Sequence, residues 1–203
     1  ESGEHGGSQR WQLTIIHLSF GERKSSHKRG QSLTDLPVRL LMFRRYMDLI
    51  YECANNFMNL VNTKYHFVFV QNRKRHDIVL DFQPSDFRHA TGLHHITDIA
   101  IEKNPMKLIN AILYTVPSKI SDRKLEKSKK YKAVSPYSGS VRERISDMRF
   151  LEQCLDTSDF MRIYQTQPFG SQIGAEYFIE AYCSEIQQNV YIFIRKRQES
   201  DQY

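Results

Sequence analysis

Three histidines, an arginine and a threonine are crowded into the segment Phe87-Arg88-His89-Ala90-Thr91-Gly92-Leu93-His94-His95. Histidine changes charge near neutral pH without help from its surroundings, and arginine presents a planar fork of donors that suits phosphate. Together these residue types could cleave a phosphodiester without a metal ion. The alternative is structural: Phe87–Gly92 could be one helical turn that Gly92 ends, with the histidines as surface residues.

The chain carries an excess of basic residues, 29 Lys and Arg against 23 Asp and Glu in 203 residues, for a formal net charge of +6. Such a balance favours an anionic partner such as nucleic acid. The basic residues concentrate in the tripeptide Arg73-Lys74-Arg75 and in the segment Lys119–Lys132, which holds seven of them. We expect both clusters to contact RNA phosphates.

The histidine segment needs secondary structure to position it, and the pattern of apolar residues predicts that structure. Apolar residues at spacings of three and four predict a long helix from Leu36 to Val61, which Thr34 or Asp35 would cap. Two β-prone runs, 65–71 and 77–83, predict a hairpin with a basic tip at 72–76 that leads into the histidines through a turn at Pro84-Ser85-Asp86. The helix stripe is expected in the core and comprises Leu40, Phe43, Met47, Ile50, Ala54, Phe57 and Val61.

Further elements follow along the chain. Asn104-Pro105 is typical of the start of a shorter helix, and the apolar spacing within 141–155 predicts another. β-Prone runs predict a first strand at Trp11–Leu18 and a closing pair at 175–183 and 189–197. The expected buried face of the shorter helix comprises Leu108, Ile109, Ile112 and Leu113.

This order of elements predicts an α+β fold, with an antiparallel sheet built from two hairpins and packed against the long N-terminal helix and several shorter helices. A hydrophobic content of 40% fits a folded globular unit. We expect one domain over residues 11–198, preceded by a flexible leader or remnant at 1–10 and followed by a polar tail at 199–203.

The segment from Phe87 to Gly92 resembles the F-x-H-x-T-G signature of the phage-encoded barnase, EndoU, colicin and RelE-like nucleases (the BECR fold), and it is closest to the fourth of those families. The later pattern Ser171-x-Ile173-x-Ala175-x-Tyr177, followed by Tyr191-Ile192-Phe193, is similar to the C-terminal hairpin of that family. The agreement runs from about Leu36 to Arg197, although Ala90 stands where a larger aliphatic residue is usual. The resemblance implies a BECR-like fold and cleavage of RNA, tRNA included, by a toxin or a phage or mobile-element effector in the bacterial cytoplasm, with an antitoxin or immunity protein as partner.

An endoribonuclease of this kind attacks the phosphate with the RNA 2′-hydroxyl and needs a base, an acid and positive charge at the phosphate. We expect His89 to transfer a proton, Thr91 to donate to the phosphate and Arg88 to balance its charge. His94 or His95 would be the second proton carrier. Weaker candidates, which only the fold can bring close, are Ser171 for catalysis and Lys119 and Tyr191 for substrate binding.

Three other functions stay open. A metal enzyme would use the histidines with Asp81, Asp86 or Asp98, but the chain lacks two histidines at helical spacing with a carboxylate base, so no metal or other cofactor is expected. An ADP-ribosyltransferase-like enzyme would use Glu176 or Glu180. A non-catalytic basic module would bind RNA or protein without turnover, with Tyr131 and Tyr137 stacking on bases.

The cysteines and the hydropathy pattern bear on the compartment. The chain has three cysteines, Cys53, Cys154 and Cys183, which are far apart and embedded in apolar patterns. This usage predicts buried thiols in a reducing compartment. No apolar run approaches the ~18 residues that a membrane-spanning helix needs. The expectation is therefore a cytoplasmic protein without a membrane partner.

Overall fold

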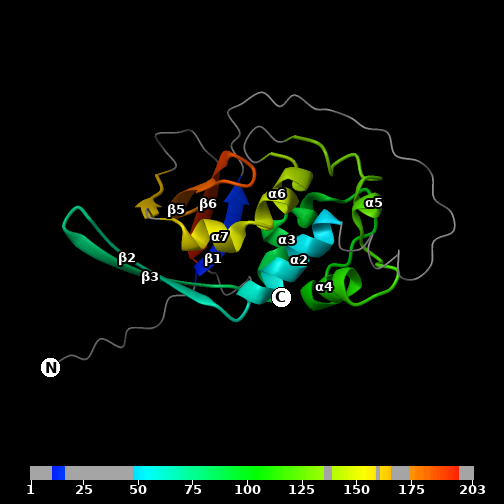
Figure 1. The fold of residues 1–203 in the computed structure, drawn as a ribbon, viewed down its shortest axis with the longest axis horizontal. Helices are drawn as coiled ribbons and strands as arrows, with labels where there is room; N and C mark the ends of the chain where they lie inside the picture. Colours follow the sequence, from blue (N-terminus) through cyan, green and yellow to red (C-terminus); the bar gives the residue numbers. More distant parts are fainter. Residues whose placement is uncertain (1–10, 17–47, 135–138, 159–160, 166–173, 197–203) are drawn as a thin grey trace.

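The computed structural model describes residues 11–16, 48–134, 139–158, 161–165 and 174–196 (Figure 1). The strands are β1 (Trp11–Ile16), β2 (Lys64–Gln71), β3 (Lys74–Asp81), β4 (Met161–Ile163), β5 (Tyr177–Cys183) and β6 (Gln188–Lys196). The helices are α2 (Leu49–Leu60), α3 (Pro84–Ala90), the 3-10 turn η1 (Leu93–His95), α4 (Pro105–Leu113), α5 (Asp122–Leu125), α6 (Val141–Met148) and α7 (Leu151–Asp156). These elements confirm the predicted α+β class.

One sheet joins both predicted hairpins, in the strand order β2-β3-β1-β6-β5-β4. Strand β1 pairs antiparallel with β6 along its whole length and parallel with β3, where Trp11 lies opposite Leu80. Both predicted hairpins are antiparallel, as expected, and the parallel β1–β3 pair is a feature that the sequence did not predict. Its cause is connectivity: the chain passes through α2 between β1 and the β2–β3 hairpin, so no tight turn forces β1 and β3 to run in opposite directions.

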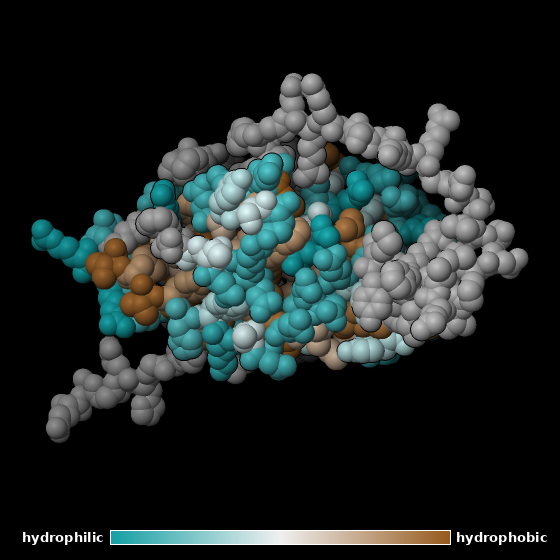
Figure 2. Space-filling view, in the orientation of Figure 1, coloured by the Kyte–Doolittle hydropathy of each residue, from teal (hydrophilic) through white to brown (hydrophobic). Residues whose placement is uncertain are grey.

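The β2–β3 hairpin projects from the body of the molecule, because β1 pairs only with its base (Figure 1). Its turn consists of Asn72 and Arg73, both at positive φ, as in the two-residue turns whose twist matches that of the strands. The expected five-residue tip is wrong in length, since Lys74 and Arg75 already belong to β3. Figure 2 shows hydrophilic residues at the tip and a hydrophobic patch beside it.

Helices cover one face of the sheet. Helices α3 and α6 contact β1, and α7 contacts β5, whereas α2 lies among the helices and contacts α3, α4, α6 and α7. In strand β6, Val190, Ile192 and Ile194 belong to the same buried core as the helices. The intervening Phe193 is also buried and stacks on Phe178, so the strand does not alternate strictly between buried and exposed residues. The predicted core helix thus packs mainly on other helices and not on the sheet.

The predicted apolar stripe is confirmed at three positions, whereas Val61 is half-buried and follows the end of α2 at Leu60. The prediction of one continuous helix from Leu36 to Val61 is wrong, because the backbone of Asp48 is extended and α2 begins at Leu49. Ile50, Ala54 and Phe57 are buried, while the predicted portion 36–47 and its caps lie outside the described residues. The carboxylate of Asp122, from α5, accepts the backbone N–H groups of Leu49 at 2.6 Å and Ile50 at 3.1 Å. A residue 73 positions away in sequence therefore satisfies donors at the start of α2.

The predicted helix over 141–155 is real but divides into α6 and α7 at Arg149 and Phe150. Arg149 donates to Glu52 of α2 at 2.7 Å, and its carbonyl accepts from Asn56 at 2.9 Å. These bonds hold the junction of α6 and α7 on α2. The face predicted for α4 is buried as expected.

The three cysteines are free and buried, as predicted, and burial raises the pKa of each thiol. A thiol with a raised pKa holds little of the reactive thiolate at neutral pH. None of the helices in the described part of the chain is long and apolar enough to cross a bilayer.

We expect Phe57→Ala to lower the free energy of unfolding by about 3–5 kcal/mol, because truncating a fully buried phenylalanine leaves a cavity. The Phe57 ring centroid lies 5.4 Å from that of Phe87 and 6.1 Å from that of Phe82. Urea unfolding measures the loss. Asn55→Ala, on the exposed face of the same helix, is the control and should change stability by less than about 0.5 kcal/mol. Equal effects of the two substitutions would contradict the core assignment.

Candidate functional site

Helix α3 carries His89 and begins directly after the strand β3 and two linking residues. Pro84 occupies the first turn, where a missing N–H costs nothing. The buried Asp86 carboxylate accepts the backbone N–H of Gln83 at 2.8 Å. The predicted turn at Pro84-Ser85-Asp86 is therefore the first turn of a helix, and the helical alternative for the backbone of Phe87–Gly92 is correct.

The chain reverses directly after α3. Gly92 adopts the left-handed conformation with φ of 73°, which favours glycine, and its N–H donates to the carbonyl of His89 at 3.0 Å. The turn η1 follows, with the N–H of His95 donating to the carbonyl of Gly92 at 3.0 Å. This reversal places His94 and His95 back beside the last turn of α3.

The reversal brings the three imidazole rings into one row. The ring centroids of His89 and His94 lie 4.5 Å apart, and those of His94 and His95 lie 3.8 Å apart. His89 and His95 are exposed, whereas His94, between them, is half-buried. Two solvent-accessible imidazoles therefore flank a third that separates them, an arrangement in which one base and one acid can serve the same substrate.

His94 is held as a neutral ring. Its Nδ1 lies 3.3 Å from the carbonyl oxygen of Arg88, so Nδ1–H is the donor. Burial, with the charges of His95, His89 and Arg144 adding to it, lowers the pKa of His94 to about 4. At neutral pH His94 is consequently uncharged, and its fixed orientation suits it to positioning its two neighbours.

His95 lines a pocket of about 310 Å³ together with Arg144 of α6 and Lys130. Burial, the Arg144 guanidinium and the charges of His89 and Lys130 lower the pKa of His95 below its usual value. A neutral imidazole next to two fixed cations is a base that stays unprotonated at neutral pH. The same cations give the pocket the charge that a phosphate requires.

Hydrogen bonds from the loop after η1 position Lys130. The Asp98 carboxylate accepts from the Ser128 hydroxyl at 2.6 Å and from the Lys129 backbone at 2.8 Å. The Lys130 ammonium donates to the Thr97 hydroxyl at 2.7 Å, which uses one of its three N–H donors. The basic segment 119–132 is thereby tied to the histidine loop.

Two residues predicted to touch the phosphate are placed differently. Thr91 is fully buried, and its hydroxyl donates to the Phe87 carbonyl at 2.7 Å. The expectation that Thr91 binds phosphate is therefore wrong, because its hydroxyl already donates to a backbone carbonyl at the end of α3. Arg88 is half-buried, and its Nε is a buried donor without an acceptor among the described residues.

The other predicted residues lie elsewhere or outside the description. Arg75 forms an exposed ion pair with Asp77 at 2.8 Å on the projecting hairpin, and the Tyr191 hydroxyl donates to Glu180 at 3.0 Å on the sheet. Lys119 is exposed in the loop after α4. Arg75, Tyr191 and Lys119 are therefore not among the described residues that line the pocket next to His95. Ser171 lies outside the described residues.

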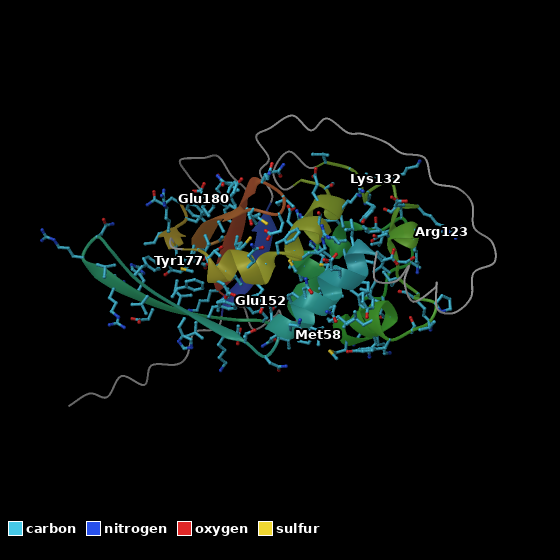
Figure 3. The ribbon with its side chains drawn as sticks, viewed as in Figure 1. Met58, Arg123, Lys132, Glu152, Tyr177 and Glu180 are labelled. Atoms are coloured by element: carbon cyan, nitrogen blue, oxygen red, sulfur yellow. The ribbon has the colours of Figure 1, made fainter. Side chains whose placement is uncertain are left out.

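The two predicted basic clusters do not form one surface. Figure 3 shows Arg123 and Lys132 of the segment 119–132 at the end of the molecule opposite to the tip of the β2–β3 hairpin. Tyr131, expected to stack on bases in a binding module, is buried and cannot do so as the chain is folded. Tyr137 lies outside the described residues.

Arg144 is the residue that sequence reasoning missed. It lies within a predicted helix, where a basic residue is normally read as part of the solvated face, yet it is buried. A Cβ built on Gly92 would lie 3.1 Å from Arg144 Nη1 and 3.3 Å from its Cδ. Gly92 thus permits both the left-handed turn and the close approach of Arg144. In the sequence, the glycine could have indicated a closely packed neighbour, but not which residue that neighbour is.

A family model described as phage-Barnase-EndoU-ColicinE5/D-RelE like nuclease4 matches residues 49–203. This match spans well over half of the chain, including α3, η1 and the pocket. The fold and the match define a BECR-like nuclease with an α+β fold. The chain belongs to this fourth family of phage-encoded nucleases, as the sequence resemblance predicted. No curated protein and no solved structure matches.

The family assignment bears on the alternatives. The family assignment supports phosphodiester cleavage. It gives no support to an ADP-ribosyltransferase that would use Glu176 or Glu180. Those carboxylates accept hydrogen bonds within the sheet, from Lys196 N at 2.9 Å and from Tyr191 at 3.0 Å. Among the residues that the structure describes, no group of three or more His, Cys, Asp or Glu side chains could hold a metal ion.

Substitution of Gly92 by alanine should disturb the fold and the pocket together. A non-glycine residue at this positive φ costs about 1–2 kcal/mol, and the added Cβ, 3.1 Å from Arg144 Nη1, requires the Arg144 side chain to shift. We expect a lower midpoint of urea unfolding and, because Arg144 lowers the pKa of His95, a higher His95 titration midpoint by NMR. Gly174→Ala, where a Cβ meets nothing within 4 Å, is the control. An unchanged His95 titration would show that Arg144 does not depend on Gly92.

Proposed function

We propose that this chain is a metal-independent endoribonuclease that cleaves RNA by attack of a 2′-hydroxyl on the adjacent phosphate. The observation that carries the proposal is the row of three imidazoles, with His95 in a pocket beside Arg144 and Lys130. These groups supply both proton carriers and the positive charge that the reaction needs. Membership of a nuclease family supports the same class of reaction.

The roles follow from charge and exposure. His95, whose pKa is lowered, takes the proton of the 2′-hydroxyl, and the 2′-oxygen forms a bond to phosphorus. The bond from phosphorus to the 5′-oxygen breaks, and His89 donates a proton to that leaving oxygen. His89 lies in the last turn of α3, where the helix dipole favours a cation. The products are a 2′,3′-cyclic phosphate and a 5′-hydroxyl.

The cations hold the charge that develops on the phosphate. Arg144 and Lys130 line the pocket next to His95, and we propose that both contact the non-bridging oxygens. The buried Nε of Arg88, which lacks an acceptor among the described residues, supports a further contribution to anion binding. The exposed basic residues of the hairpin, Arg73, Lys74 and Arg75, would hold a more distant part of a long RNA.

The proposed biological setting is that of a toxin or a phage or mobile-element effector acting on RNA, tRNA included, in a bacterial cytoplasm. The family description, which includes phage, colicin and RelE-like nucleases, supports this setting. Three free buried thiols are in keeping with a reducing compartment. Such an enzyme requires control by an antitoxin or immunity protein.

We expect pure protein to cleave RNA in the presence of a chelator, with 2′,3′-cyclic phosphate ends, and to spare a strand with 2′-deoxyribose at the cleavage site. His95→Ala and His89→Ala should each lower the rate by roughly 10²-fold or more, since each removes one proton carrier. The exposed His66 of β2 provides the matched control, and His66→Ala should keep the wild-type rate.

Melting curves accompany these rates. The two active-site variants should retain the wild-type melting temperature, because both side chains are exposed. RNA binding without cleavage by the wild-type protein would favour the non-catalytic module instead. Full activity in a stable His95→Ala or His89→Ala protein would refute the assigned role of that histidine.

The pH profile tests the charge environment of His95. The acid limb of the kcat/KM profile reports protonation of the free base, and we expect its midpoint below pH 6.5 because the pKa of His95 is lowered. Lys130→Gln removes one of the charges that lower this pKa, so the midpoint should move to higher pH. Lys129→Gln, at an exposed neighbouring position, should leave it in place. The same acid-limb midpoint in the wild type, Lys130→Gln and Lys129→Gln would contradict the role of His95 as the base.

A further inference from the structure

Strand β2 lies at one end of the sheet, on the hairpin that projects from the body of the molecule (Figure 1). All eight of its residues, Lys64–Gln71, pair with β3, and no other described strand pairs with β2. The backbone N–H and C=O groups that point away from β3 therefore have no strand to bond among the described residues. A free edge of this kind is a template on which another chain can add a strand.

The two faces of β2 differ in exposure. Tyr65, Phe67 and Phe69 are half-buried and pack against the core. On the opposite face, Val68 is 58% exposed and Val70 is 70% exposed. Two exposed valines in succession on one face of a strand gain free energy only when another apolar surface covers them. The outer face of β2 thus offers apolar contacts beside the free edge.

Strand β2 also lacks the residues that usually keep an edge strand from pairing. Charged side chains, lysine above all, and proline have this role in native sheets. The segment 65–71 contains no Lys, Arg, Asp, Glu or Pro. By contrast, β3 pairs with β1 only at Leu80, and the rest of that edge carries Lys74, Arg75 and Asp77. The edge of β2 is therefore the one that favours an added strand.

The charge of the hairpin decides the chemistry of the partner. Residues 64–81 carry four Lys or Arg against two Asp. Arg75 is already paired with Asp77 at 2.8 Å, whereas the side chains of Arg73 and Lys74 at the tip make no ion pair or hydrogen bond with another described residue. A second copy of this chain would bring like charges to the hairpin, and an acidic partner would bring opposite ones.

We infer that β2 binds an extended segment of an acidic protein as an added strand. Apolar side chains of the segment cover Val68 and Val70, and acidic side chains at one of its ends lie beside Arg73 and Lys74. RNA phosphates could use the two tip cations, as proposed above for a long RNA, but would leave the free backbone groups and the valines uncovered. The inference is independent of the proposed function, because the pocket next to His95 takes no part in it.

Synthetic peptides test the inference on the full chain. The probe is a peptide of alternating valine and threonine, matched in length to β2, with a glutamate pair at its N-terminal end in one version and at its C-terminal end in the other. We expect one version to bind at least tenfold more tightly than the same peptide with a lysine pair. Hydrogen exchange of the amides in 64–71 should slow on binding, and methylation of alternate peptide nitrogens should abolish it.

Two results with these peptides would overturn the inference. The first is absence of binding by both glutamate versions. The second is binding without slower exchange of the amides in 64–71, which would place the peptide elsewhere on the molecule.

A substitution on the free edge tests the role of the valines. Val68→Lys places a charge on the edge and should weaken binding of the glutamate peptide at least tenfold. The matched control is Val116→Lys, at a position after α4 with 57% exposure, which should bind the peptide as the wild type does. Because both positions are exposed, both variants should keep the wild-type melting temperature. Equal losses in the two variants would refute binding at β2.

A substitution at the tip tests the charge of the partner. Lys74→Glu neutralises the positive charge of Arg73 and should remove the preference for glutamate over lysine peptides. Lys74 is the suitable position because Arg73 lies in the turn at positive φ. Lys103→Glu, at an exposed lysine before α4, is the matched control and should keep the preference. A preference that survives in Lys74→Glu would contradict an acidic partner at the tip.

Two further measurements examine other occupants of the edge. Sedimentation should show a monomer, and a dimer that Val68→Lys abolishes would overturn the inference in favour of a second copy. A DNA oligonucleotide, which has no 2′-hydroxyl for cleavage, serves as the nucleic-acid probe. Slower exchange in 64–71 with this oligonucleotide, but with neither glutamate peptide, would overturn the inference in favour of nucleic acid.

Discussion

The left-handed turn at Gly92 is the constraint on which the rest of the site depends. Without a reversal at this point, α3 would continue and carry His94 and His95 around the helix, away from a common row with His89. The turn also leaves the space that the Arg144 side chain occupies, since a Cβ on Gly92 would come within 3.1 Å of its Nη1. Gly92 therefore permits both the reversal of the chain after α3 and the position of the Arg144 guanidinium at the pocket.

Electrostatic coupling within the pocket links binding to protonation. The Arg144 guanidinium and the Lys130 ammonium, which we propose to hold the phosphate, also lower the pKa of His95 in the free protein. A bound phosphate partly offsets their charge, so the histidine becomes more basic when its substrate arrives. In the function that we propose, the base is therefore uncharged in the free protein and becomes a stronger proton acceptor when RNA occupies the pocket.

The sequence predicted most of the elements, because each one has a local cause. The spacing of Leu108, Ile109, Ile112 and Leu113 marks the buried face of α4, and the basic segment 72–76 marks the tip of a hairpin between two β-prone runs. The sequence did not predict the contacts that join residues far apart in the chain. Asp122 satisfies the start of α2 from 73 residues away, and β1 pairs with β3 because of the topology between them.

The candidate site was predictable in part for the same reason. His89, His94 and His95 are close in sequence, so one local turn is enough to assemble their rings, and residue types alone indicated proton transfer. Arg144 and Lys130 approach them only through the packing of α6 and the hydrogen bonds of Asp98 and Thr97 to the basic segment. A local motif can therefore supply the proton carriers that we propose for this nuclease, but the cations that we propose to hold the phosphate come close to them only in the folded chain.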